Sequence, residues 1–390
     1  MPIPLWPFRS SKQDVRPLFV GLGTFSDNIK YAFLFYLRRY GRDSASYMTH
    51  DPHTHQALSG HGLPAILWRG TETGEAVDAI RASSIIVCDT HLLPHSAYGP
   101  NFQKVAGDKP TINVWHGIPI KDIGRRYHVE NKVIEADLLA DSERPWHFLI
   151  PSRETLPVFL DSYPNAHFYV ARYPRNLVWA YPELKGHEIN VDAGILSQLV
   201  GDKEQGITRL MFCPTFRDNP INLVTHYALP ELNSVLKQAG IRLYVKFHHY
   251  DHASIFPPDM DLSNIRLVGS YTDIYPLLPS TDAFVTDISS LLFDYALLSK
   301  PTFLILPEDP QNIAALRVTA PTLPFVEGLV REPTMAALIE KLINSRQDVM
   351  SRGLQATVAL RKRMYSCAET SSIERVSRWI HKLARDASRG

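Results

Sequence analysis

The sequence has few cysteines, almost no net charge and no long apolar run. Its 390 residues contain 3 cysteines, which are far apart and form neither a CxxC pair nor a zinc-binding spacing. Reduced thiols are therefore expected. The formal net charge is +1, so no overall field attracts nucleic acid, and no nucleic-acid partner is predicted. No run approaches the ~18 apolar residues of a membrane-spanning helix. With no signal-peptide pattern at the N-terminus, these features predict a cytoplasmic protein.

Several common catalytic and cofactor motifs are also absent. No P-loop, GxSxG or HExxH sequence occurs. Gly21 and Gly23 follow a strand-like run, but Ser26 replaces the third glycine of a GxGxxG fingerprint, so a nicotinamide cofactor is not expected. Four histidines crowd residues 50–61 without the spacing or acidic partners of a known metal site. No metal-binding residue is predicted, and the need for a divalent cation is left open.

What the sequence does contain is an alternation of short apolar runs and longer helical patterns. Strands are predicted at 18–20, 65–68, 85–88, 111–115, 148–150 and 168–171, and then at 210–213, 243–247, 265–268, 283–285 and 302–306. Helices are predicted at 28–39, 229–238, 290–298, 335–343 and near 354–364. This alternation is typical of parallel sheets that are covered by helices on both faces.

The length and this alternation predict an α/β protein of two Rossmann-type, doubly wound domains that face a central cleft. The polar stretch 181–206 is the expected connection, which gives a first domain over 1–185 and a second over 186–365. Residues 366–390 are predicted to form a basic amphipathic helix, for which docking on the protein body is favoured over contact with anionic lipid. Ligands of such sheets bind beyond the carboxyl ends of strands, so polar residues that follow strands are the site candidates.

One candidate is the strand-to-helix turn that contains Asp287, Ser289 and Ser290. The first turn of a helix has unpaired N–H groups that suit a phosphate, and the two hydroxyls add donors. Ordinary helix capping by Asp287 or Ser289 is the alternative. The Asp287 carboxylate would repel a phosphate unless a cation or a donor hydroxyl lies between them.

A second candidate is WHGIPIK at 115–121, where a strand delivers His116 into a Gly-Ile-Pro turn. An ordinary pKa of ~6.5 suits histidine to act as a general base near neutral pH. The chain has 16 histidines, most of which are expected to be structural or solvated. His116 is selected for its place after a strand, and Lys121 adds positive charge nearby.

Two further strand ends in the second half carry cationic and hydroxyl groups. Thr215 and Arg217 follow one predicted strand, while Lys246 and His248 lie at the end of another. Arginine and lysine at such positions can neutralise a diphosphate. Each pair taken alone is also typical of a solvated loop.

Seven segments, in order, resemble the CDP-glycerol glycerophosphotransferase family of teichoic-acid primases and polymerases, which also occurs in capsule biosynthesis. They are FSDNIKY at 25–31, WHGIPIK at 115–121, YPRN at 173–176, CPTFRD at 213–218, KFH at 246–248, DIYPLL at 273–278, and TDISS at 286–290 followed by FDY at 293–295. The resemblance implies a GT-B-like fold, with the acceptor facing the first domain and CDP-glycerol bound in the second.

The resemblance also implies a reaction and a set of site residues. An acceptor hydroxyl would attack the β-phosphorus of CDP-glycerol and CMP would leave, with the catalytic set consisting of His116 as the base and His248 as a stabiliser of phosphoryl charge. The implied donor-binding residues are Thr215, Arg217, Lys246, Asp287, Ser289 and Ser290, and those on the acceptor side are Asn28, Lys30 and Lys121. The implied acceptor is a lipid-linked envelope glycan or polymer, which would bring the enzyme to the inner face of the membrane.

Two other functions fit the same architecture. One is a glycosyltransferase that uses a nucleotide sugar, because a fold alone does not decide the chemistry. The other is a non-catalytic nucleotide-binding module of an envelope-assembly complex. CDP-ribitol in place of CDP-glycerol, and priming as opposed to polymerising activity, are also left open by the sequence.

Overall fold

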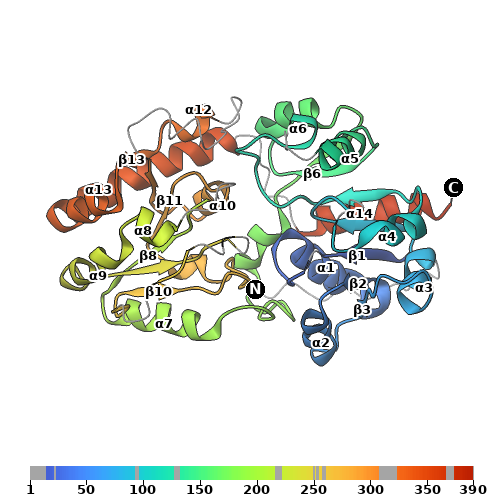
Figure 1. The fold of residues 1–390 in the computed structure, drawn as a ribbon, viewed down its shortest axis with the longest axis horizontal. Coiled ribbons are helices and arrows are strands. Elements are labelled where there is room, and N and C mark those ends of the chain that lie inside the picture. Colours follow the sequence, from blue (N-terminus) through green and yellow to red (C-terminus); the bar gives the residue numbers. More distant parts are fainter. Residues whose placement is uncertain are drawn as a thin grey trace.

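The computed structural model describes residues 15–21, 23–92, 96–126, 132–215, 222–248, 251, 254–256, 261–306, 323–365 and 373–389. Within these residues the chain forms two parallel sheets, each covered by helices, that lie side by side (Figure 1). Strand order is 3-2-1-4-5-6-7 in the first sheet and the same up to the sixth strand in the second. Both are Rossmann-type, doubly wound sheets. The predicted fold class is therefore confirmed.

The first sheet is assembled from strands with apolar cores and polar residues at their carboxyl ends. Its strands are β1 (Pro17–Val20), β2 (Ser46–Thr49), β3 (Ala65–Leu67), β4 (Ile85–Cys88), β5 (Thr111–Asn113), β6 (His147–Ile150) and β7 (His167–Val170). Its helices are α1 (Asp27–Tyr40), α2 (Pro52–Gly60), α3 (Glu75–Ala82), α4 (Gly99–Ala106), α5 (Lys132–Ser142) and α6 (Leu156–Ser162). The topological switch lies between β1 and β4, which pair in parallel.

The second sheet repeats this design after a connection that includes α7 (Ala193–Glu204). Its strands are β8 (Thr208–Phe212), β9 (Ile241–Val245), β10 (Ile265–Leu267), β11 (Ala283–Thr286), β12 (Thr302–Ile305) and β13 (Val330–Glu332). Its helices are α8 (Leu223–His226), α9 (Leu229–Gln238), α10 (Leu291–Ala296), α12 (Leu323–Val326) and α13 (Met335–Met364). Here the switch lies between β8 and β11, whose carboxyl ends carry Thr215 and Asp287 shortly downstream.

The last helix, α14 (Ile373–Ala387), returns to the first domain and packs on α1 (Figure 1). Its apolar face is buried, and the Trp379 ring stacks on Tyr169 with 4.7 Å between ring centroids. His381 stacks on Tyr40 at 4.2 Å. The apolar face therefore forms part of the core, as expected for the docked alternative. None of the described helices has the length and apolarity required to cross a bilayer.

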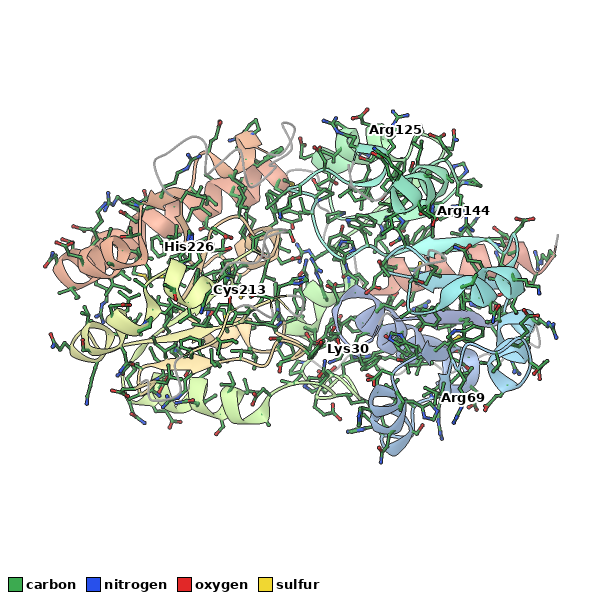
Figure 2. All side chains as sticks on the ribbon, in the orientation of Figure 1. Lys30, Arg69, Arg125, Arg144, Cys213 and His226 are labelled. Atoms are coloured by element: carbon green, nitrogen blue, oxygen red, sulfur yellow. The ribbon has the colours of Figure 1, made fainter. Side chains whose placement is uncertain are left out.

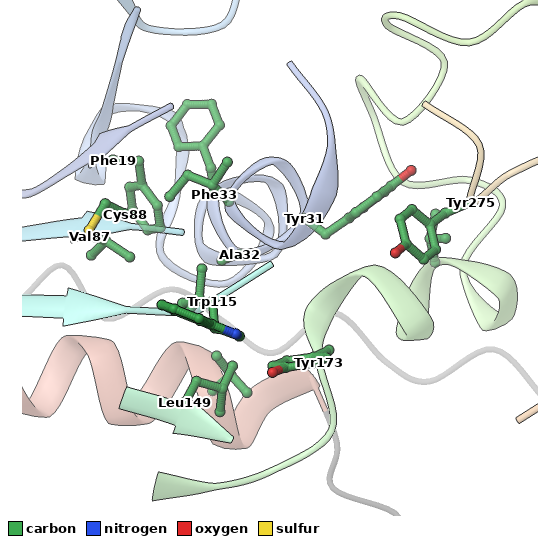
Figure 3. Packing of buried hydrophobic residues seen from close by; sticks show 14 of the residues in the cluster. Phe19, Tyr31, Ala32, Phe33, Val87, Cys88, Trp115, Leu149, Tyr173 and Tyr275 are labelled. Carbon is green, nitrogen blue, oxygen red and sulfur yellow. The ribbon is translucent and has the colours of Figure 1, made fainter. Parts of the chain in front are cut away.

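Helix α1 is buried on more sides than an amphipathic pattern predicts. Residues 28–37 are all buried, because the sheet, α14 and the second domain each cover part of the helix. Figure 3 shows Trp115 packed between Ala32 of this helix and Leu149 of β6. Such packing fixes the segment after β5, where the predicted base lies.

Candidate functional site

The turn after β5 carries His116 and is held from several directions. Asn113 Oδ1 accepts a hydrogen bond from the Trp115 amide at 2.8 Å, and Asn28 Nδ2 donates to the Trp115 carbonyl at 2.8 Å. Trp115 has φ of +53°, a left-handed conformation that is costly for an aromatic residue. The buried indole, with its neighbours, compensates for this strain. The turn is therefore a fixed element, and it presents the next residue at the carboxyl end of the sheet.

The position of His116 and the tautomer of its ring are those that a general base requires. Its Nδ1 lies 3.0 Å from the carbonyl oxygen of Asp89. Because a carbonyl can only accept, Nδ1 carries the hydrogen, and Nε2 of the neutral ring has the lone pair. The residue is accessible to solvent, while one side of its ring stacks on Trp115 with 4.5 Å between centroids.

The protein environment favours the neutral form of the His116 ring. Desolvation by the surrounding protein lowers the pKa of His116 from its ordinary value of 6.5, although the hydrogen bond to Asp89 and the charge of Asp27 act in the opposite direction. Burial also raises the pKa of the Asp89 carboxyl well above its usual range. A neutral imidazole with an accessible Nε2 can accept a proton from a hydroxyl.

The two buried residues predicted on the acceptor side support the structure of the site. Asn28 is fully buried; its Oδ1 also accepts from the Arg175 amide at 3.3 Å. Lys30 is likewise buried, and its ammonium donates to Asp273 at 2.8 Å and to two backbone carbonyls in the 187–189 segment. These bonds use all three of its hydrogens. Figure 2 shows Lys30 near the centre of the molecule, where the two domains meet.

On the second domain, Asp287 organises the loop at the switch point. Its side chain is buried and accepts from the Thr215 amide at 2.8 Å, the Thr215 hydroxyl at 2.5 Å and the Tyr227 hydroxyl at 3.0 Å. The Thr286 hydroxyl reaches the Cys213 carbonyl at 2.7 Å and tightens the same loop. Both donors of Thr215 therefore serve Asp287. The carboxylate is surrounded by donors, which limits its repulsion of an anion nearby.

Ser289 and Ser290 follow Asp287 after the buried Ile288 and are partly exposed. The Ser290 side chain lies close to the His116 turn: a Cβ built on Gly117 would lie 2.9 Å from Ser290 Oγ. The helix that begins here, α10, is shorter than predicted, because 297–299 form turns. The contact nevertheless brings the predicted base and the predicted donor serines together across the domain boundary.

The remaining predicted site residues lie at or beyond this junction. Lys246 is partly buried, donates to the Ser270 carbonyl at 2.6 Å, and has a pKa lowered by desolvation. His248 is exposed after β9. Lys121 is partly exposed just beyond the turn. Arg217 lies outside the described residues.

Three charged residues at the junction were given no role from the sequence. Asp89 follows β4 directly, and a systematic search of strand ends would have selected it. Arg175 and Asp294 occur within the motifs YPRN and FDY, but nothing in their spacing shows that they are buried and paired at 2.6 Å. Only the folded chain brings residues 119 positions apart into contact. Within the described residues, no group of three or more His, Cys, Asp or Glu side chains could hold a metal ion.

The chain matches a known protein family along almost its whole length. A family model described as CDP-Glycerol:Poly(glycerophosphate) glycerophosphotransferase matches residues 18–382. The chain belongs to this family. The resemblance drawn from the seven segments is thereby confirmed, and the match includes both sheets and most of α14 of this family member.

The curated relatives of this family member have names that place them in teichoic-acid synthesis. The chain is 27% identical over 206 residues to the teichoic acid glycerol-phosphate transferase of Staphylococcus aureus, covering 49% of this chain and 50% of that protein. It is 30% identical over 170 residues to the teichoic acid ribitol-phosphate primase of Bacillus spizizenii, covering 41% and 37%. The chain thus spans half or less of the length of these curated relatives.

A solved structure with the same fold is the wall teichoic acid polymerase TagF in a variant soaked with CDPG. It superposes with a TM-score of 0.73 and 18% sequence identity, over 96% of this chain and 90% of that chain. This likeness shows that the two domains share the fold of that solved chain.

Proposed function

We propose that the protein transfers glycerol phosphate from CDP-glycerol to a hydroxyl of a lipid-linked cell-envelope glycan or polymer and releases CMP. The observation that carries the proposal is the close approach of Ser290 to the His116 turn. It juxtaposes a neutral imidazole with an accessible Nε2 and the hydroxyl-bearing loop at the switch point of the second sheet. Family membership supports CDP-glycerol as the donor.

In the proposed reaction, Nε2 of His116 takes the proton of the acceptor hydroxyl. The acceptor oxygen forms a bond to the β-phosphorus of CDP-glycerol, and the bond from that phosphorus to the bridging oxygen breaks. CMP leaves with the bridging oxygen. Transfer of this kind depends mainly on alignment and on stabilisation of charge on the phosphoryl oxygens. The enzyme needs to hold the acceptor oxygen, the β-phosphorus and the bridging oxygen in line and to supply hydrogen-bond donors around the phosphoryl group.

The donor side is assigned to the loop around Asp287. The hydroxyls of Ser289 and Ser290 are partly exposed and can donate to the diphosphate. Among the described residues Lys246 donates one ammonium hydrogen, to the Ser270 carbonyl, and its charge can neutralise part of the charge of the diphosphate. His248, by its place after β9, is assigned to the reacting phosphoryl oxygens. Arg217 is assigned to the diphosphate on the strength of the family motif.

The remaining assigned residues act around these groups. Thr215 and Asp287 fix the donor loop through their mutual hydrogen bonds. Asn28 and Lys30 hold the acceptor side of the site in place through their buried hydrogen bonds. Lys121 is assigned to binding negative charge on the acceptor. Contact with an anionic membrane would use exposed basic side chains of α14, such as Arg378 and Lys382, since its apolar face is buried.

A donor panel tests the proposed function. The purified protein is incubated with CDP-glycerol, CDP-ribitol or UDP-glucose, together with a short-chain lipid-linked disaccharide with or without one glycerophosphate. Nucleotide release and product mass are measured. The expected result is CMP release with CDP-glycerol that depends on acceptor and adds one or more glycerophosphate units to it. Release from UDP-glucose alone would show a glycosyltransferase, and release from CDP-ribitol alone would change the donor.

A further inference from the structure

Arg175 makes two hydrogen bonds within the first domain and one to the second domain. Its Nη1 donates to Asp27 Oδ1 at 2.5 Å and to the His116 carbonyl at 2.8 Å, and its Nη2 donates to Asp294 Oδ2 at 2.6 Å. Arg175 and Asp294 are each 1% exposed, so solvent does not weaken their attraction. One guanidinium therefore links the first residue of α1, the backbone of the predicted base, and a helix of the second domain.

The surroundings of Arg175 hold the guanidinium in one place. The guanidinium carbon lies 5.1 Å from the ring centroid of Tyr173 in the first domain and 4.8 Å from that of Tyr275 in the second. Figure 3 shows both tyrosines beside the end of α1. Burial lowers the pKa of Arg175, but Asp27 and Asp294 outweigh burial and raise it, so the group stays charged.

Asp294 lies on α10, which begins beside the donor serines. It is four residues after Ser290, the residue in contact with Gly117. The direct contact and the ion pair thus join the same two elements, the His116 turn and α10. The carboxylate of Asp294 anchors the helix, while the peptide oxygen of His116 anchors the turn.

We infer that Arg175 is a positioning residue, which fixes the backbone of His116 against α10 so that the base and the donor serines keep one separation. The inference rests on the proposed function, because it needs His116 to act on an acceptor whose target phosphorus lies beside Ser290. Alignment of reacting groups accounts for large rate effects, and a misplacement of about 1 Å can cost ~100-fold in rate.

The inference depends on the shape of the guanidinium as well as its charge. Arginine offers five donors in a rigid fork, which lets one side chain reach three acceptors in different directions. The lysine ammonium is a compact point charge on a flexible stem, and it cannot bridge His116 and Asp294 in the same way. Arg175→Lys therefore separates positioning from simple charge.

The test compares steady-state kinetics of wild type, Arg175→Lys, Asp294→Asn and the double variant, with CDP-glycerol and the lipid-linked disaccharide. Rates are normalised to the number of donor-binding sites found by calorimetric titration of CDP-glycerol, so that misfolded protein does not count. The expected result for each single variant is a kcat ~10- to 100-fold lower, with KM for CDP-glycerol within about threefold. The double variant is expected to be no slower than the slower single variant, because the two substitutions break the same link between Arg175 and Asp294.

Asp282→Asn is the matched control. Asp282 pairs with the mostly buried Arg209 at 2.6 Å inside the second domain, so its loss disturbs a partly buried ion pair far from the turn. The control is expected to lower the unfolding midpoint while kcat per donor-binding site stays near wild type. A positioning role and a purely structural role thus give different results.

Each outcome decides the inference. A kcat per donor-binding site near wild type in Arg175→Lys and Asp294→Asn would overturn it, because the link would then be only structural. A rise in KM for CDP-glycerol with unchanged kcat would also overturn it and assign Arg175 to donor affinity. Absence of turnover by wild type with every donor would instead contradict the proposed function.

Discussion

Gly117 of the first domain lies directly against Ser290 of the second. A Cβ at Gly117 would be 2.9 Å from Ser290 Oγ and 3.5 Å from Ser290 Cβ. Contacts as short as the first require a shift of the neighbour, and here the neighbour is a residue assigned to the donor. An alanine at position 117 would therefore require the Ser290 hydroxyl to shift.

Gly117→Ala is expected to lower kcat by ~10-fold, since the added methyl group displaces Ser290 or the His116 turn. In a Ser290→Ala background the Oγ is absent, so the same substitution is expected to have a smaller effect, and only the strain of alanine at φ +157° is common to both backgrounds. Gly201→Ala is the control, because nothing lies within 4 Å of the added atom. Equal effects of Gly117→Ala in both backgrounds would show that the contact does not limit the reaction.

The buried pair between Lys30 and Asp273 is expected to stabilise the domain junction. Lys30→Met leaves the Asp273 carboxylate buried without its cation and should lower the free energy of unfolding by about 3–5 kcal/mol. Urea unfolding followed by tryptophan fluorescence measures this loss. Lys30→Met combined with Asp273→Asn should recover part of it, because no uncompensated charge remains.

Arg38→Met provides the comparison for this pair. Arg38 lies on the same helix and pairs with Glu183 at 2.9 Å, but both side chains are exposed. Its loss is expected to change the free energy of unfolding by less than about 1 kcal/mol. Similar losses from Lys30→Met and Arg38→Met would contradict the importance of the buried pair.

The pH dependence of the reaction should report the protonation of His116. Only the neutral imidazole can accept the acceptor's proton, so the rate rises with pH as His116 loses its own proton. Desolvation lowers the pKa of His116 below 6.5, so the acidic limb of kcat/KM should have its midpoint below pH 6.5. Asp27→Asn removes a negative charge that raises this pKa, and should move the limb further toward acid. A limb above pH 6.5 would assign the titration to another group.

Much of the fold could be predicted from sequence because buried parallel strands are continuous apolar runs. Strand β4 and helix α9 have the predicted bounds, and most other predicted strands and helices differ from the observed ones by a few residues. Strands β2 and β13 were missed, since the sequences SYMT and VRE mix polar and apolar residues. The predicted helices 335–343 and 354–364 are one element, α13, with a kink at Ser345.

The site could be predicted only in part. His116 and Asp287 follow strands, so the rule that ligands bind beyond strand ends selects them from sequence alone. The inward roles of Asn28 and Lys30 could not be predicted, because their partners are backbone carbonyls and carboxylates far away in the chain. The Arg175 link has the same origin. Polar residues on a nearly all-buried helix reveal their partners only in the folded state.

The most direct test of the account is the activity of His116→Asn with CDP-glycerol and the lipid-linked disaccharide. Asparagine keeps a side-chain N–H that can serve the Asp89 carbonyl but has no basic nitrogen. His61→Asn, a change at an exposed histidine outside the junction, is the control. The account predicts that CMP release falls at least ~100-fold in His116→Asn, while CDP-glycerol affinity and the control's activity stay near wild type. Wild-type CMP release by His116→Asn would contradict the assignment of His116 as the base.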